Sequence, residues 1–289
     1  MTDQAESLRV LSQQRWRERP EPARVIAITS GKGGVGKTNL VVNLAACLSR
    51  MGYRTAVLDG DLGMANVDIV LGLNPPYNIV DVIAGRKRLM EVAAIGPLGM
   101  QVFAGGSGLY ELANLNIWQL EKFTNSLAEL DEVCDVLLID TGAGLSQGVV
   151  RLVLSAAEVI VVTTPEPTAL ADAYGIVKVV ARRSPGTRVH VAVNMAYSSE
   201  EGEALFGHFQ RATRRFLELE LNYLGYVPFD NLVSRCVQEQ CLFTVEYPNS
   251  KVARAVEQIA HNLVGVQVPT AGGLKGLVSR MARLLGAGQ

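Results

Sequence analysis

The amino-acid sequence predicts an α/β fold, a doubly wound and mainly parallel sheet with helices on both faces. The first observation is that short, wholly apolar runs alternate with stretches of helical periodicity from Val25 to about residue 265. Strands of a parallel sheet are covered on both sides and need such runs. The second is a glycine-rich stretch, TSGKGGVGKTN at 29–39, between the first apolar run and the first helical one. A strand, a tight glycine loop and a helix commonly open folds of this class.

The elements of this body follow one another along the chain. We expect strands at VIAIT, TAVLD, MQVFAG, DVLLID, VIVVTT, RVHVAVN and LNYLGYV, which are residues 25–29, 55–59, 100–105, 135–140, 159–164, 188–194 and 221–227. We expect helices at 37–50, 117–130, from 145, at 170–181 and at 203–220. Because strands and helices alternate without a break in the pattern, residues 25–268 are predicted to form one domain.

Both ends of the chain stand apart from this body. Residues 1–24 are predicted to be a short helix to about residue 14 and a charged, proline-bearing linker. At the other end a turn-rich joint leads into a last helix within residues 269–289. At 100° per residue its apolar residues fall within an arc of about 120°, while its basic residues lie outside that arc. The apolar set is Leu274, Leu277, Val278, Met281, Leu284 and Leu285, and the outer set is Lys275, Ser279, Arg280 and Arg283.

Composition narrows the classes of protein. The formal net charge of −1 and the pI of about 6.3 give no overall positive field that would favour nucleic acid. The four cysteines include one close pair, Cys236 and Cys241, whose spacing suits neither a zinc ribbon nor a CxxC redox site, so we expect reduced thiols. No signal peptide precedes the body, and no apolar run approaches the ~18 residues of a membrane span. These features predict a cytoplasmic protein.

The glycine-rich stretch fits two nucleotide-binding loops. Read as GxGxxG it is Gly31, Gly33 and Gly36, a dinucleotide fingerprint in which Asp59 would bind a ribose. Read as GxxxxGK[ST] it is a phosphate loop in which Lys37 meets the β- and γ-phosphates and Thr38 meets Mg²⁺. A dinucleotide has no use for that lysine and hydroxyl, so the phosphate loop is favoured.

Residues later in the chain support the phosphate loop. DVLLID ends in Asp140, the position from which a second acid reaches the magnesium shell beside such a loop. No NKxD stretch for guanine follows the late strands, which favours ATP. Asn194, and the turn from Pro228 to Asp230, come at the carboxyl ends of predicted strands, where open α/β sheets bind ligands.

The loop KGGVGKT, with its extra Lys32, resembles the deviant Walker A loop of the MinD/ParA family of dimerising P-loop ATPases. LDGDLGMANVDIVLG at 58–72 resembles that family's first switch, IDTGAG at 139–144 its second, and TTPEPTALADAYGIVK at 163–178 its PE-containing segment. DQAESLR at 3–9 and YPNS at 247–250 are similar to the FlhG branch, which regulates flagellar number and placement. Gly60, between the switch acids, departs from the usual residue and bears on flexibility rather than on chemistry.

The resemblance implies a site. Lys32 would reach across a dimer interface to the other subunit's nucleotide, Asp61 would position the attacking water, and Lys37 would stabilise charge on the phosphates. Thr38, Asp59 and Asp140 would support Mg²⁺ and its waters. The residues expected to contact ATP are Gly31, Gly33, Gly34, Val35, Gly36, Lys37, Thr38, Asn39, Glu166, Asn194, Pro228 and Asp230.

The resemblance also implies partners. Residues 274–285 would be a membrane-targeting helix that brings the ATP-bound homodimer to the inner face of the cell membrane. The N-terminal segment would stimulate an FlhF-like GTPase of the signal-recognition-particle type through Asp3, Gln4, Ala5, Leu8 and Arg9. Flagellar C-ring proteins or a flagellar transcription regulator are further expected partners.

Alternatives remain at this point. A ParA-type DNA-partition ATPase would need a basic surface in the dimer, and a MinD-type division-site ATPase would share the same loop and switches. An iron–sulfur carrier of the same fold would need a CxxC that Cys236 and Cys241 do not supply. The last helix, instead of binding a membrane, could pack on the chain's own core, because an amphipathic pattern is the same in both cases.

Overall fold

The structure is a computed structural model, which describes residues 22–61, 66–105, 126–127, 129–266 and 273–284. Its centre is an eight-stranded sheet with the order β3-β4-β2-β5-β1-β6-β7-β8, in which only the β3–β4 pair is antiparallel. The strands are β1 (Arg24–Ser30), β2 (Thr55–Gly60), β3 (Ala93–Ile95), β4 (Gln101–Phe103), β5 (Val136–Ala143), β6 (Glu158–Thr163), β7 (Arg188–Ala196) and β8 (Asn222–Pro228). The predicted parallel sheet is confirmed.

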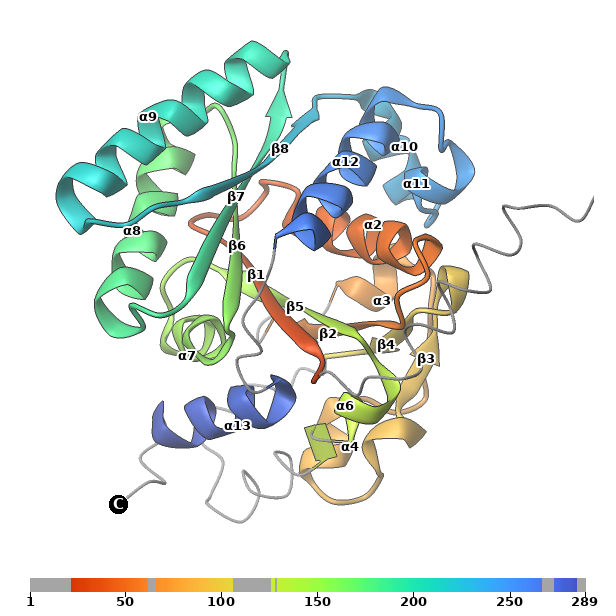
Figure 1. The fold of residues 1–289 in the computed structure, drawn as a ribbon. Helices are drawn as coiled ribbons and strands as arrows, with labels where there is room; N and C mark the ends of the chain where they lie inside the picture. The colour runs from red at the N-terminus through yellow and green to blue at the C-terminus, as the bar shows by residue number, and fades with distance from the viewer. Residues whose placement is uncertain (1–21, 62–65, 106–125, 128, 267–272, 285–289) are drawn as a thin grey trace, which may run out of the picture.

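Helices cover both faces of the sheet (Figure 1). They are α2 (Lys37–Arg50), α3 (Val67–Val70), α4 (Ile79–Ile83), α6 (Leu130–Val133), α7 (Gln147–Ser155), α8 (Pro167–Arg183), α9 (Ser199–Leu217), α10 (Asn231–Gln238), α11 (Phe243–Glu246), α12 (Lys251–Gly265) and α13 (Gly273–Leu284). Two short 3₁₀ turns, Leu89–Glu91 and Pro97–Gly99, flank β3.

The core is two apolar layers, one on each face of the sheet. Successive side chains of a strand point to opposite faces. Ile26 and Ile28 of β1 therefore pack with α2 and α12, while Val25 and Ala27 pack with α7 and α8 on the other side. All four of these side chains are buried, which is why the strand sequences read as unbroken apolar runs.

Several elements were not expected from the sequence. The edge strand β3 has only three residues, too few for a pattern to emerge, and α3 and α4 are single turns. Helices α10 and α12 are longer and do carry signals that could have found them. Asp230 and Ser250 cap them, accepting hydrogen bonds from Leu232 N and Ala253 N. The helix predicted at residues 1–14 lies outside the described residues, and so does most of the helix predicted at residues 117–130.

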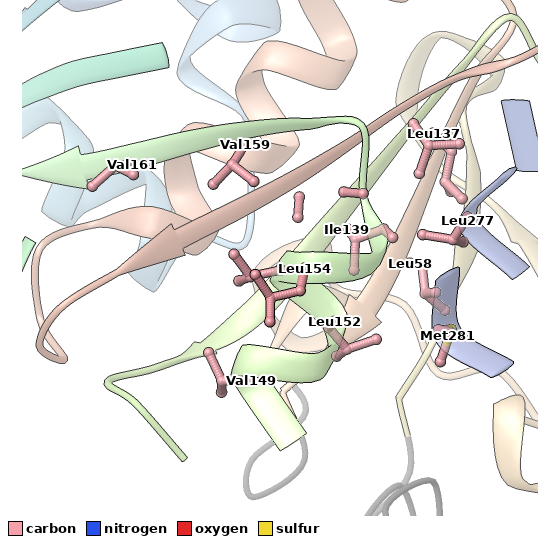
Figure 2. Close-up of a cluster of buried hydrophobic side chains, with 14 of the residues drawn as sticks. Leu58, Leu137, Ile139, Val149, Leu152, Leu154, Val159, Val161, Leu277 and Met281 are labelled. Carbon is pink, nitrogen blue, oxygen red and sulfur yellow. The ribbon is translucent and has the colours of Figure 1, made fainter. Parts of the chain in front are cut away.

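Helix α13 packs on the α7 face of the sheet. Leu274, Leu277 and Met281 are buried and belong to the same apolar layer as Leu58 of β2 and Leu137 of β5. Figure 2 shows Leu277 and Met281 pointing from the helix toward those strand residues. The apolar face that the sequence predicts is thus covered by the body. Within the described part of the chain, none of the helices combines the length and the apolar character needed to cross a bilayer.

Candidate functional site

The glycine loop joins the carboxyl end of β1 to the start of α2, at the centre of the sheet. Gly36 has a φ of 79°, and a Cβ there would stand 2.3 Å from Nδ2 of Asn194. A Cβ at Gly31 would meet the backbone of Asp172 in α8 at 2.2 Å. Glycine is therefore required at position 36 by its backbone conformation and at position 31 by close packing. The loop leads into the N-terminus of α2, and a glycine loop at a helix N-terminus suits an anion.

Lys37 and Thr38 meet a single carboxylate. Lys37 Nζ lies 2.6 Å from Asp140 Oδ1, and Thr38 Oγ1 donates to Asp140 Oδ2 over 2.7 Å. Both Lys37 and Asp140 are buried. β1 and β5 are neighbours and place Ile28 opposite Asp140, so the acid stands beside the end of the strand that feeds the loop. The sheet thus brings together the groups that the sequence assigns to phosphate and magnesium.

A second acid lies on the next strand. Asp59 of β2 is the register partner of Asp140 and is fully buried. Its carboxylate accepts backbone N–H groups from Asp61, Asn66 and Val67 over 2.8 to 3.1 Å. Burial raises the pKa of Asp59 to about 6, outweighing those hydrogen bonds, and burial likewise raises the pKa of Asp140. A divalent cation would offset the cost of two such neighbouring carboxylates.

This donor set fits magnesium. Mg²⁺ usually takes one or two protein carboxylates and leaves its other positions to waters and substrate phosphates. The Thr38 hydroxyl and the Asp140 carboxylate would hold it at the phosphate loop, and Asp59 would act from one strand further away. When bound there, the ion would neutralise charge on the phosphates. The carboxylate of Asp59 is fully engaged by backbone donors and is buried, which argues against the ribose-binding role of the dinucleotide alternative.

A pocket of about 450 Å³ opens beside the loop. It brings together six of the predicted contact residues, which are Gly34, Gly36, Asn39, Asn194, Pro228 and Asp230. Asn194 Nδ2 donates to the carbonyl of Val35 over 2.7 Å and so ties the end of β7 to the loop. Asp230 lines the pocket and also caps α10. The size and largely apolar lining suit a nucleoside.

The remaining predicted residues lie around the edge of this site. Lys32 Nζ forms an ion pair with Glu166 at the start of α8 and lies 3.5 Å from Thr168 Oγ1. Lys32 is therefore directed to its own α8. The carboxylate of Asp61 lies against Gly142 of the second switch, close to where a Cβ would stand. Glu166 contacts Lys32 and is not among the residues that line the pocket.

The sequence reasoning missed most of the pocket's apolar wall. Met195, Val233, Val237 and Phe243 line the pocket, and two of them belong to α10. The signal was present in VPFDNLVSRCVQ, where Asp230 begins an amphipathic turn directly after a strand.

A glycine loop at a helix N-terminus, with a lysine, a hydroxyl and a carboxylate beside it, is the site that binds a triphosphate together with a divalent cation. This arrangement puts the chain in the class of phosphate-loop nucleoside triphosphatases. The sequence matches the family described as "ParA: NUBPL iron-transfer P-loop NTPase" over residues 21–264. It is 40% identical to the antiactivator FleN of Pseudomonas aeruginosa over 248 residues, 86% of this chain and 89% of FleN. It is 32% identical to the flagellum site-determining protein YlxH of Helicobacter pylori over 271 residues, 91% of each chain. The chain belongs to the ParA family of P-loop ATPases.

Solved structures agree on the fold. The cell-division ATPase MinD of Pyrococcus furiosus superposes with a TM-score of 0.69 at 26% identity, covering 85% of this chain and all of that one. MinD of Pyrococcus horikoshii, solved with Mg-ADP, gives 0.67 at 26% identity over the same shares. The predicted family resemblance, fold class and ATPase activity are confirmed, and the dinucleotide alternative is excluded. The roles of the individual site residues stay predictions.

Proposed function

We propose that the chain is an ATP-dependent dimerising switch that regulates the number and placement of flagella. The names of two relatives, antiactivator FleN and flagellum site-determining protein YlxH, support the flagellar part. The observation that supports the switch is the position of α13, which packs on the apolar layer behind β2 and β5. Leu58 and Ile139 precede Asp59 and Asp140 in the chain and share an apolar layer with Leu277 and Met281.

The proposed substrate is ATP with Mg²⁺. Lys37 and the N-terminus of α2 hold the phosphates, and the pocket between β7, β8 and α10 takes the nucleoside. Asp61 orients the water that attacks the γ-phosphate, and Lys37 stabilises the charge that develops. MinD of Pyrococcus horikoshii, solved with Mg-ADP, supports this choice.

The proposed dimer forms across the carboxyl edge of the sheet. Exposed apolar side chains gather at the strand ends and the second switch. Tyr197 follows β7 and is 83% exposed, Phe229 follows β8 and is 56% exposed, and Leu145 follows the second switch and is 51% exposed. A patch of this kind beside a ligand site is typical of an interface. In the dimer Lys32 leaves Glu166 and reaches the nucleotide of the other subunit.

The proposed output is release of α13. In the single chain its apolar face is buried against β2, β5 and α7, and Arg280 Nε donates to the carbonyl of Ser155 at the end of α7 over 2.7 Å. Helix α7 directly follows the second switch, so a nucleotide-driven movement of that switch is passed to the seat of α13. Released, the helix lies in an anionic membrane interface at the inner face of the cell membrane.

Further partners belong to the same proposal. The N-terminal segment, with Asp3, Gln4, Ala5, Leu8 and Arg9, stimulates an FlhF-like GTPase, and these residues lie outside the described part of the chain. The word antiactivator in the name of FleN supports a flagellar transcription regulator as a partner. C-ring proteins are the remaining candidates.

Flotation with anionic liposomes tests the switch. With ATP and Mg²⁺ the wild-type chain should dimerise and float, and with ADP it should do neither. Lys32→Ala should bind ATP as a monomer and stay in the soluble fraction, whereas Asp61→Ala should accumulate as a floating dimer. Flotation of the wild type that is independent of nucleotide would overturn the proposal. A dimer that binds duplex DNA and ignores liposomes would support the DNA-partition alternative.

A further inference from the structure

The turn at the end of α10 brings two cysteines together. Cys241 N donates to the carbonyl of Cys236 over 2.9 Å, and Gln240 N donates to Val237 over 3.3 Å. Gln240, with a φ of 53°, takes the left-handed conformation between them. This pair of hydrogen bonds is a Schellman motif, which ends a helix by folding the chain back on its last turn. The motif usually buries an apolar contact between its two ends, and here both of those residues are cysteines.

The geometry is that of a pair able to form a disulfide. One backbone hydrogen bond of 2.9 Å between Cys241 N and Cys236 O holds the two Cα atoms within about 7 Å of each other. That is the limit within which a disulfide can form without backbone movement. Both side chains belong to the same apolar layer. In the structure all four cysteines of the chain are free thiols.

The two thiols differ in access. Cys236 is 1% exposed, and burial, with the neighbouring Cys241 thiol, raises its pKa to about 12. Cys241 is partly exposed. A reagent in solution therefore meets Cys241 first, and the Cys236 sulfur is positioned to react only with its neighbour.

We propose that Cys236 and Cys241 form a reversible disulfide when the chain meets a low-molecular-weight disulfide such as oxidised glutathione, and that this bond holds α10 in place at the nucleotide pocket. The Cys241 thiolate attacks the reagent, forms a mixed disulfide and expels one glutathione thiolate. Cys236 then loses its proton to that thiolate or to water, its sulfur attacks Cys241 Sγ, and the second glutathione leaves as a thiolate that takes up a proton. The two protein thiols give up two electrons, which reduce one reagent disulfide to two thiols.

The turn lies beside the nucleotide pocket, so a disulfide between Cys236 and Cys241 would affect that pocket. Val233 and Val237 of α10 line the pocket, and Phe243 lines it from just beyond Cys241. Gln240 Nε2 also donates to the carbonyl of Ile69 in α3, over 2.9 Å, and α3 lies within the first switch. A covalent bond across this turn prevents α10 from unwinding at its C-terminal end, so bound nucleotide leaves more slowly. This part rests on the proposed nucleotide pocket.

Peptide mass mapping after treatment of the full chain with oxidised glutathione tests the pair. The peptides that carry Cys236 and Cys241 should be joined and should have lost two hydrogens, while Cys47 and Cys134, both buried, should be unmodified. Cys236→Ala, with Cys236→Ser as a second variant, should retain one glutathione on Cys241. Cys241→Ser should stay unmodified. A wild-type chain that keeps glutathione on Cys241, or that does not react, would overturn the pair.

Release of a fluorescent ATP analogue tests the consequence separately. The oxidised chain should release the analogue at least a few-fold more slowly than the reduced chain, and dithiothreitol should restore the faster rate. Cys241→Ser should release it at the reduced rate with and without oxidant. If the disulfide forms but the release rate is unchanged, the proposed effect on α10 is wrong, whereas the proposed disulfide is confirmed. If the analogue does not bind to the reduced chain, the nucleotide pocket itself is wrong.

Discussion

The glycines of the phosphate loop differ in whether the folded chain itself requires them. Gly31 and Gly36 are required by close neighbours of the folded chain, and Gly36 also by its φ of 79°. Gly33 differs, because an added Cβ there would meet no atom of the described chain within 4 Å and its φ is not in the left-handed region. The described chain therefore does not itself require glycine at position 33, and we propose that phosphate oxygens approaching the backbone account for it.

Gly33→Ala should lower ATP affinity at least several-fold while leaving the melting temperature of the nucleotide-free chain within about 2 °C of wild type. The added methyl group would stand where phosphates approach the loop. Gly186→Ala is the matched control, since a Cβ there also meets nothing within 4 Å and the position follows α8, on the far side from the loop. Titration and thermal melts of both variants check this. Equal ATP affinity in the two would remove the ligand explanation for Gly33.

Glu166→Gln addresses the ion pair that holds Lys32. Lys32 is 32% and Glu166 61% exposed at the side chain, and an exposed pair contributes about 0.2–1 kcal/mol. Freeing Lys32 should therefore tighten the ATP-dependent dimer by no more than about five-fold. Sedimentation measures this, with Glu203→Gln on α9 as a control of equal charge change. A weaker dimer would contradict the intrachain role and support direct contact of Glu166 with nucleotide, as the family resemblance implies.

At the scale of elements, a buried charge cluster joins the strands at the end opposite the site. Arg24 of β1 contacts both carboxylate oxygens of Glu158 of β6 over 2.6 Å, and His190 of β7 lies 3.0 Å from the same carboxylate. Arg24 Nη1 also donates to the carbonyl of Leu263 in α12. Burial alone would raise the pKa of Glu158, but the hydrogen bonds and the Arg24 charge outweigh it and lower that pKa to about 2. Arg24, Glu158 and His190 thus join three strands, and Arg24 also ties them to α12.

Glu158→Gln should lower the free energy of unfolding at pH 7 by about 3–5 kcal/mol, because it leaves the Arg24 guanidinium without the carboxylate that pairs it. A carboxylate with a lowered pKa stabilises the fold above its ordinary pKa and loses that contribution as pH falls toward the folded value, here about 2. The difference between variant and wild type should therefore be constant from pH 7 to about 5 and shrink below pH 4.5. Urea unfolding across this range checks the trend. Glu220→Gln, which breaks an exposed pair with Arg214, should leave the stability close to that of the wild type throughout.

Helix α13 offers a second test at this scale, because its buried and exposed faces can be changed one at a time. Leu277→Glu drives a charge into the apolar layer, so the helix should leave the body and also fail to bind liposomes. Lys275→Glu lies on the exposed face and should leave the helix docked while weakening binding to anionic lipid more than to neutral lipid. Hydrogen exchange reports docking and flotation reports lipid binding. A helix α13 that stays docked in Leu277→Glu would contradict the burial of Leu277 against the sheet.

For the whole molecule, the central sheet was predictable because each of its long strands is buried on both sides and reads as an apolar run. The loop, its lysine and its acids were predictable because phosphate chemistry fixes residue type and spacing. The sequence could not show that Lys32 faces Glu166, since a contact between residues 134 positions apart depends on how α8 packs. It also could not place α13, because the same amphipathic face serves a bilayer and a protein core.

Asp131 connects the two ends of the described chain. Its Oδ1 accepts from Ala23 N over 3.0 Å and from Leu274 N over 3.1 Å. Asp131→Ala should therefore speed hydrogen exchange at both amides together, because each loses the same acceptor. Arg280→Gln, which loosens only the contact with Ser155, should affect α13 and leave Ala23 protected. Faster exchange at only one of the two amides in Asp131→Ala would show that Ala23 and Leu274 are held independently.

The contact at Asp131 also places the two ends of the described chain next to each other. A Cβ on Gly273 would lie 2.4 Å from Cβ of Pro22, so the backbone that leads to the N-terminal segment and the backbone that begins α13 pass within contact of each other. A GTPase held by the one and a bilayer held by the other would therefore start from a common anchor. If the proposed function holds, a protein recruited by the N-terminal segment would be brought next to the lipid surface that α13 binds.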